Sequence, residues 1–276
     1  MLNMWIKKYL DLYKKLCLPP VILELVSEKR SIPSGVWNTP PESWGFPPAL
    51  LPLWSDGSLF AYQGYWKHWF VKRQMTIVEL QSEDGLFAME VARNFNQLAR
   101  LLVLHGVTSD DGVSARIKKF ADLCGVDDAM EIDRISIELG DFPESLRELN
   151  SYSQNLPARL IKEGDVYTGD FPLETTVTLP IENYSLIEFS HTARPKLKEQ
   201  KGIPAWLVEE DQHPVFINCL KRNDICGAWM SLNSNGWESD TLIKSVIQLS
   251  KLANDSLFLE LANAWVTAAE VEFVSY

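Results

Sequence analysis

The segment Leu50–Leu80, LLPLWSDGSLFAYQGYWKHWFVKRQMTIVEL, determines the fold class, because short apolar and aromatic runs alternate in it with turn residues. The Asp56-Gly57 dipeptide provides the positive φ angle that a hairpin turn requires, and Gly64 marks a second turn or a β-bulge. Short strands that follow one another in this way predict an antiparallel meander. The predicted strands are residues 50–54, 59–63, 65–71 and 75–80.

The chain before the meander is predicted to be helical and then irregular. Apolar residues recur every three or four positions over residues 3–16, and Pro19-Pro20 ends this helix. Residues 31–49 are rich in proline and glycine, which excludes regular structure. The aromatic residues expected to pack this segment against the body are Trp37, Trp44 and Phe46.

Helices are also predicted after the meander. Residues 83–104 show a helical apolar period that His105-Gly106 ends. Shorter helices are expected within residues 109–150, with a break at Gly125. Two more helices, at 239–251 and 255–270, are predicted near the end of the sequence.

Residues 157–230 predict a β-rich region, because β-branched and alternating apolar runs recur in it. Its predicted strands include residues 174–181, 184–190, 205–210, 214–220 and 225–232. Since strands cluster rather than alternate singly with helices, the predicted class is α+β. The expected architecture is an antiparallel meander flanked by helices, with a second lobe that is β-rich and helical.

The order of these elements predicts three parts. Residues 1–108 are expected to form an α+β lobe, and residues 109–156 a helical connection. Residues 157–276 are expected to form an acidic β-rich lobe with C-terminal helices. These parts can pack as one unit.

The charge of the chain is distributed unevenly. Residues 1–106 hold 11 Lys and Arg against 9 Asp and Glu, a net of +2, whereas residues 107–276 hold 15 against 28, a net of −13. The total of −11 disfavours nucleic acid as a partner, because phosphate contacts require basic side chains. It favours a cationic protein partner. The alternative is a negative surface that maintains solubility alone.

The sequence predicts a soluble, cytoplasmic protein without a membrane contact. Asp11 and Lys14 interrupt what would have to be an apolar leader segment. No run approaches the roughly 20 apolar residues that a membrane span needs. The four cysteines are scattered, which predicts reduced thiols, with a Cys219–Cys226 disulfide or a metal site as the alternative.

Short catalytic motifs are absent from the sequence. It contains no phosphate-binding glycine loop, no nucleophile elbow and no HExxH zinc motif. No cofactor and no metal are therefore expected. A dispersed active site, assembled from distant segments, stays open as an alternative.

A dense group of aromatic and polar residues is the first candidate site. If residues 65–71 form a strand, Trp66, His68 and Phe70 share one face. Such a face can be a binding platform with His68 as acid, base or donor, or it can be a packed sheet face. The residues of this candidate site are Trp54, Asp56, Tyr62, Trp66, His68, Trp69 and Arg73.

An acidic turn is the second candidate site. Glu209, Glu210 and Asp211 precede His213, so a metal site, a solvated turn and a contact with a basic partner are all conceivable. The solvated turn is the ordinary interpretation of such a run. The contact with a basic partner agrees with the charge of residues 107–276.

The order of elements over residues 1–105 has a parallel in a known family. An amphipathic N-terminal helix precedes a proline-rich approach, an aromatic segment, an acidic-glycine turn, aromatic strands around a glycine and a closing helix. The residues that carry this pattern are Gly45-Phe46-Pro47-Pro48-Ala49-Leu50, Leu51-Pro52-Leu53-Trp54, Ser55-Asp56-Gly57 and Gly64. They resemble the SUKH superfamily, the SMI1/KNR4-like proteins. The resemblance implies a small α+β domain with a bent central sheet, and many bacterial members are immunity proteins that bind and block a toxin.

Three functions are consistent with these observations. The leading hypothesis is a non-catalytic cytoplasmic immunity protein that binds and occludes a basic toxin. The second is a hydrolase with a dispersed site around His68. The third is a scaffold or complex subunit that exposes Trp37 or Trp44 to another protein.

Overall fold

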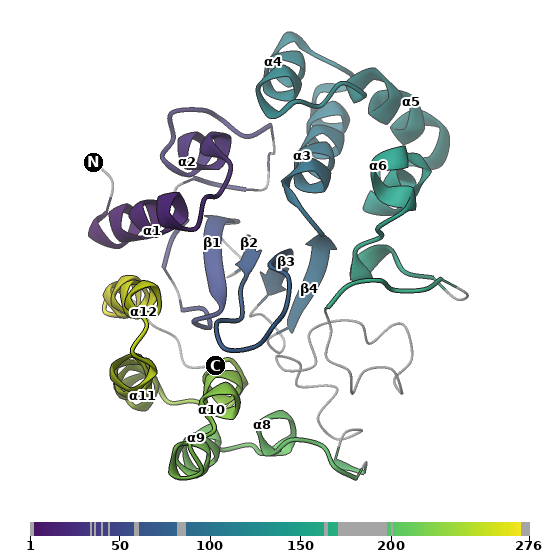
Figure 1. Cartoon of the computed structure of the whole chain (residues 1–276). Helices are drawn as coiled ribbons and strands as arrows, with labels where there is room; N and C mark the ends of the chain where they lie inside the picture. Colours follow the sequence, from purple (N-terminus) through teal and green to yellow (C-terminus); the bar gives the residue numbers. More distant parts are fainter. Residues whose placement is uncertain are drawn as a thin grey trace.

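The protein has an α+β fold, with a four-stranded antiparallel sheet at the centre and helices around it (Figure 1). This arrangement is taken from a computed structural model. The structure describes residues 3–33, 35, 37–39, 41–43, 45–57, 61–81, 87–162, 165–170, 198–199 and 201–271.

The sheet is a meander in the order β1-β2-β3-β4, as predicted. Its strands are β1 (Leu50–Ser55), β2 (Ala61–Trp66), β3 (Thr76–Gln81) and β4 (Phe87–Ala92). Every residue of β1 and β2 is buried. Both faces of these two strands are therefore covered, which explains why their sequences are almost continuously apolar.

A bulge in β1 explains Gly64. The pairing of β1 with β2 shifts register between Pro52 and Trp54, directly opposite Gly64 and Gln63. A Cβ atom on Gly64 would lie 2.4 Å from the carbonyl oxygen of Leu51, so only glycine permits this approach. The bulge interpretation of Gly64 is confirmed, and the turn interpretation is wrong.

The predicted strand at 65–71 is wrong, because β2 continues through Gly64 to Trp66. The chain then runs without regular structure to β3. The predicted helix at 83–104 is also corrected. Its first part contains β4, and α3 (Phe95–Asp110) begins after Asn94, whose side chain accepts a hydrogen bond from the Gln97 amide.

The glycine expected to end α3 lies inside that helix instead. A Cβ atom on Gly106 would meet Ile117 Cδ1 at 2.3 Å and Pro33 Cβ at 3.0 Å. Gly106 therefore allows close contact between α3 and its neighbours rather than a helix end. The helix ends at Asp111, which has a positive φ of 54°.

The N-terminal helix is confirmed as α1 (Met4–Lys15). A second helix that was not predicted, α2 (Pro20–Val26), follows it. Proline is favourable at the first position of a helix, so Pro20 starts α2 as well as closing the preceding turn. The irregular segment after α2 packs against the body through buried Trp37 and Phe46, as predicted, and Trp44 lies outside the described residues.

Short helices fill the middle of the chain, as predicted. Gly125 ends the first of them with a φ of 69°, the left-handed conformation that glycine favours. These elements are α4 (Ala115–Cys124), α5 (Ala129–Leu139), the 3-10 helix η1 (Pro143–Glu148), α6 (Asn150–Ser153) and the 3-10 helix η2 (Ala158–Leu160).

The predicted strands at 205–210, 214–220 and 225–232 are wrong, because these residues are helical. They lie in or beside α8 (Ala205–Val208), α9 (Gln212–Lys221) and α10 (Ile225–Leu232). Asp211 and Asp224 cap α9 and α10 by accepting backbone hydrogen bonds. The predicted strands at 174–181 and 184–190 lie outside the described residues.

The last two helices, α11 (Ser239–Ala253) and α12 (Ser256–Ala269), are confirmed. Helix α12 packs along α1, so the first and the last labelled helices lie side by side (Figure 1). Trp265 of α12 donates its indole hydrogen to the carbonyl of Phe46 (2.7 Å). The domain boundaries stay a prediction, and these contacts join the first predicted lobe to the last.

The four cysteines are free thiols, as predicted. Among the described residues, no helix combines the length and the apolar composition that crossing a membrane requires.

Candidate functional site

The aromatic residues of the first candidate site belong to the core. Trp54, Tyr62 and Trp66 are buried almost completely. The indole hydrogen of Trp54 is donated to Oε1 of Gln63 (2.7 Å), and the ring of Tyr62 packs edge-on against Phe46 (centroids 5.2 Å apart). This geometry fits a packed sheet face rather than a platform for a partner.

His68 is enclosed between two tryptophans, and 5% of its surface is exposed. The indole nitrogen of Trp66 lies 3.1 Å from Nε2, and that of Trp229 lies 3.1 Å from Nδ1. A neutral imidazole accepts a hydrogen bond at one nitrogen only, so one indole donates to it at a time. His68 thus links the end of β2 to α10. Because His68 is buried and both ring nitrogens face indoles, the hydrolase hypothesis gains no support.

The remaining residues of this group are closer to the surface. Trp69 is half-buried, with Lys67 Nζ 4.7 Å from its ring centroid and Phe258 edge-on at 5.9 Å. Arg73 Nη1 lies 3.5 Å from Nε2 of His68. The carboxylate of Asp56 accepts a hydrogen bond from the amide of Ala61 (3.2 Å) and so closes the hairpin turn between β1 and β2.

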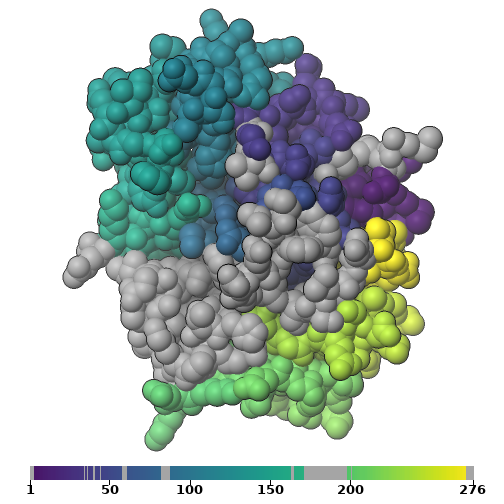
Figure 2. Space-filling model, turned by 180° about the vertical axis from the view of Figure 1, so that it is seen from behind, coloured from purple at the N-terminus to yellow at the C-terminus, as the bar shows by residue number. Residues whose placement is uncertain are grey.

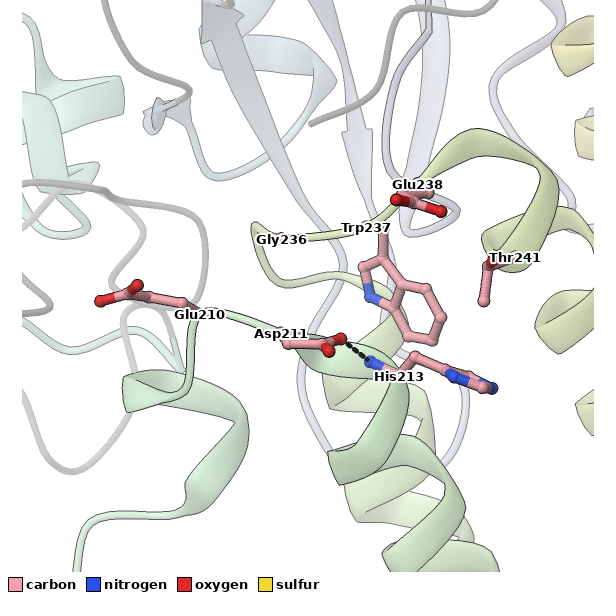
Figure 3. Close-up of a pocket in the computed structure, with 7 residues that line it drawn as sticks. All are labelled: Glu210, Asp211, His213, Gly236, Trp237, Glu238 and Thr241. Carbon is pink, nitrogen blue, oxygen red and sulfur yellow. Dashed lines mark hydrogen bonds between the residues drawn. The ribbon is translucent and has the colours of Figure 1, made fainter.

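The acidic turn is the candidate site that stays exposed. Glu209, Glu210 and Asp211 connect α8 to α9, and all three are exposed. They border two hollows. The first, which we call the acidic hollow, has a volume of about 460 Å³ and is shown in Figure 3. It is lined by Glu210, Asp211, His213, Gly236, Trp237, Glu238 and Thr241.

The second hollow shares Asp211 with the first. Its volume is about 590 Å³, and it adjoins Glu209 and Asp211 on one side and Lys221 and Arg222 on the other. Its mixed charge distinguishes it from the acidic hollow, whose described lining includes no Lys or Arg.

One glycine makes the acidic hollow possible. Gly236 has a φ of 109°, and a Cβ atom on it would lie 1.8 Å from the carbonyl oxygen of Glu210. The loop between α10 and α11 can therefore approach the acidic turn only with glycine at this position. The amide of Gln212 donates to the carbonyl of Gly236 (3.3 Å) and fastens the two segments together.

Trp237 forms the wall of the acidic hollow. Its indole nitrogen donates to the carbonyl of Ser231 (2.7 Å), and its ring packs edge-on against Phe216 (5.9 Å) and His213 (6.1 Å). Figure 3 shows this ring close to Glu238 and His213. The wall is thus held rigidly by the body of the protein.

The charge of the acidic hollow is negative. Asp211 accepts a hydrogen bond from the His213 amide (3.1 Å) as the cap of α9, and Glu238 lies across the hollow. Glu210 points away from Trp237 (Figure 3) and pairs with Lys198 (3.0 Å). Both partners of that pair are exposed, so the pair is weak and can exchange. The ring of Trp237 is 3% exposed, so the exposed carboxylates, and not the indole face, suit an ammonium or guanidinium group.

A metal site does not form at this turn. Among the described residues, no group of three His, Cys, Asp or Glu side chains has an arrangement that could hold a metal ion.

The structure contains a buried carboxylate, Glu90, that was not predicted from the sequence. Glu90 in β4 is fully buried, and its oxygens accept hydrogen bonds from Thr76 Oγ1 (2.6 Å), the Ala158 amide (2.9 Å) and the Tyr167 hydroxyl (3.0 Å). Burial raises the pKa of Glu90 to about 7, against the lowering effect of Arg93, whose Nε lies 3.7 Å away. A polar residue within the apolar run of β4 was the signal, hidden because that run was assigned to a helix.

Comparisons of the chain with models of protein families, with curated proteins and with solved structures found no match. The resemblance to the SUKH superfamily therefore stays a prediction.

Proposed function

We propose that this protein is a non-catalytic binding protein that captures a basic protein through the acidic hollow. One observation carries the proposal. The hollow is lined by three exposed acidic residues, Glu210, Asp211 and Glu238, beside the buried ring of Trp237, and the Glu210 carboxylate points away from that ring. The carboxylates suit an arginine or lysine side chain of a partner.

The charge of the chain supports the same partner. The net charge of −11 comes from residues 107–276, which include the acidic hollow. Such a field repels nucleic acid and accelerates the association of a cationic protein. Binding of this kind weakens as salt screens the charges.

The finer proposal is an immunity protein that acts in the cytoplasm and occludes a basic toxin. It is supported by the resemblance over residues 1–105 and by the electrostatic advantage that an acidic protein has against a cationic enzyme. The confirmed meander agrees with the α+β domain that the resemblance implies.

The test is capture of a partner from the native cells by the tagged protein, with washes at low and high salt and mass spectrometry of the retained proteins. We expect one basic partner that is released as salt rises. The variant Glu210→Gln/Asp211→Asn/Glu238→Gln removes three charges while asparagine preserves a cap at position 211. This variant should retain much less of the partner than the wild type does.

The matched control removes three exposed carboxylates elsewhere, with Glu28→Gln, Asp122→Asn and Glu148→Gln. It changes the net charge equally and should retain the partner. Equal loss in both variants would show that the overall field, not the acidic hollow, binds the partner. If both variants retain the partner equally well, the proposal is overturned. Co-expression with the neighbouring gene product tests the immunity role, which fails if that product is harmless or stays toxic.

A further inference from the structure

The free face of α5 carries an unusual apolar stripe. Ala129, Ile132 and Ile135 point into the core. Met130 and Ile137 are 70% and 79% exposed. They are seven residues apart, which is about two helical turns, so they lie on the same side of the helix. Asp133 and Arg134 occupy the turn between them on that side.

Another large exposed apolar residue follows the end of α5 in the sequence. Phe142 is 66% exposed, and its ring lies against the backbone of Gly140, where a Cβ atom would meet it at 3.3 Å. Single exposed apolar residues are ordinary, whereas several large ones on and just after one helix are a candidate interaction surface.

A hollow of about 360 Å³ adjoins the stripe at Ile137. Asp111, Asp133 and Asp141 contribute three carboxylates to it, and its described lining includes no Lys or Arg. The nearest basic residue on α5, Arg134, is already paired on its own helix with Glu131 and Glu138. The apolar stripe is therefore bordered by negative charge on this side.

We propose that the α5 face, defined as Met130, Ile137, Phe142, Asp111, Asp133 and Asp141, docks a cationic amphipathic segment of a partner protein. Apolar side chains of that segment cover the stripe, and a lysine or arginine enters the hollow beside it. This is the helix-in-groove mode of recognition with a charged margin.

Charge decides between this partner and the other occupants. A two-fold contact with a second copy would bring both sets of three aspartates into one interface, and their repulsion would oppose it. An anionic membrane or a nucleic acid would meet the same repulsion. A cationic segment satisfies both the apolar stripe and the carboxylates.

The α5 face is separate from the acidic hollow. Helix α5 lies at one end of the molecule and α9 at the opposite end, in both Figure 1 and Figure 2. The inference therefore does not depend on the proposed function, and the two surfaces can be disabled independently.

The probe is a fluorescein-labelled peptide of about 14 residues, with leucine and lysine at helical spacing. Its binding to the protein is measured by fluorescence anisotropy. The variant Met130→Gln/Ile137→Gln should weaken its binding about tenfold. The control Leu252→Gln/Leu259→Gln changes two apolar residues on α11 and α12 that are 55% and 43% exposed, and it should leave the affinity within about twofold.

Two further measurements test the charged margin. Asp133→Asn/Asp141→Asn should weaken peptide binding and reduce its salt dependence, whereas Asp240→Asn/Glu270→Gln should not. A peptide in which glutamate replaces lysine should not bind. Glu210→Gln/Asp211→Asn/Glu238→Gln should bind the lysine peptide like the wild type.

The proposal is overturned if the α5 variants bind the peptide like the wild type, or if the control variants weaken binding equally. Loss of binding in the acidic-hollow variant alone would assign the peptide to that hollow and also overturn it. Sedimentation adds an independent outcome. A dimer that Met130→Gln/Ile137→Gln dissociates would show that a second copy covers the α5 face instead.

Discussion

The hydroxyl of Tyr167 lies 3.0 Å from both carboxylate oxygens of Glu90, although 77 residues separate them in the sequence. Thr76 and the amide of Ala158 complete the set of donors. The carboxylate thus joins β3, β4, η2 and the segment around Tyr167. Loss of any one of these donors would leave the buried carboxylate with an unsatisfied oxygen and would destabilise the folded protein.

Glu90 should make the stability of the protein depend on pH. Its pKa is about 7 in the folded protein, above the ordinary value of 4.5, so the folded state holds the proton more tightly. The free energy of unfolding should therefore fall as pH rises from about 4.5 to about 7, by at most about 3 kcal/mol. Glu90→Gln cannot ionise and should lose this dependence, measured by urea unfolding at several pH values.

His105 should raise the free energy of unfolding over part of the pH range in which Glu90 lowers it. Burial lowers the pKa of His105 to about 4, so the folded state releases its proton and gains stability as pH rises from about 4 to about 6.5. Both Glu90→Gln and the wild type contain His105, so its contribution cancels when their free energies of unfolding are subtracted at each pH. A difference that is the same at every pH would contradict the role given to Glu90.

Tyr167→Phe should remove one donor from Glu90 and keep the ring. We expect a loss of about 1–2 kcal/mol of unfolding free energy. The loss should be larger above pH 7, because the ionised carboxylate accepts the stronger hydrogen bond. The matched control is Tyr9→Phe. The Tyr9 hydroxyl is buried without a hydrogen-bond partner among the described residues, so its removal should be neutral or stabilising.

Periodicity predicted the parts of the fold that are defined locally. Residues 3–16 and 50–54 matched α1 and β1 within a residue or two, because a long amphipathic pattern and a run before Asp-Gly each have one favourable structure. The runs at 214–220 and 225–232 are short and almost wholly apolar, and such runs fit a strand or a buried helix equally well. Asp211 and Asp224, which cap these helices, were the signals that decide between them.

The acidic hollow and the cluster around Glu90 differ in how far the sequence could predict them. The acidic turn at 209–211 was visible as a charge run, and the structure adds Trp237 and Glu238 from a distant loop. The cluster around Glu90 was not visible, because its donors Thr76 and Tyr167 come from segments that only the fold brings together. Periodicity reports which face of an element is buried, not which polar groups meet there.

His68→Ala should destabilise the protein by about 2–4 kcal/mol, measured by urea unfolding. The change leaves a cavity in the core and removes the imidazole that accepts a hydrogen bond from the indole of Trp66 or that of Trp229. The control His213→Ala alters an exposed histidine and should change stability by no more than about 0.5 kcal/mol. Unchanged stability of His68→Ala would mean that His68 is not packed between the two indoles.

Gly236→Ala should distort the acidic hollow. The new Cβ atom would lie 1.8 Å from the carbonyl oxygen of Glu210, so the backbone must move in addition to adopting an unfavourable positive φ. We expect a loss of more than about 2 kcal/mol in urea unfolding and weaker capture of the basic partner.

Gly125→Ala is the matched control, because Gly125 also has a positive φ but nothing within 4 Å of its Cβ position. It should cost about 1 kcal/mol and leave partner capture intact. Equal costs for the two variants would show that the loop does not approach the acidic turn as closely as the structure places it.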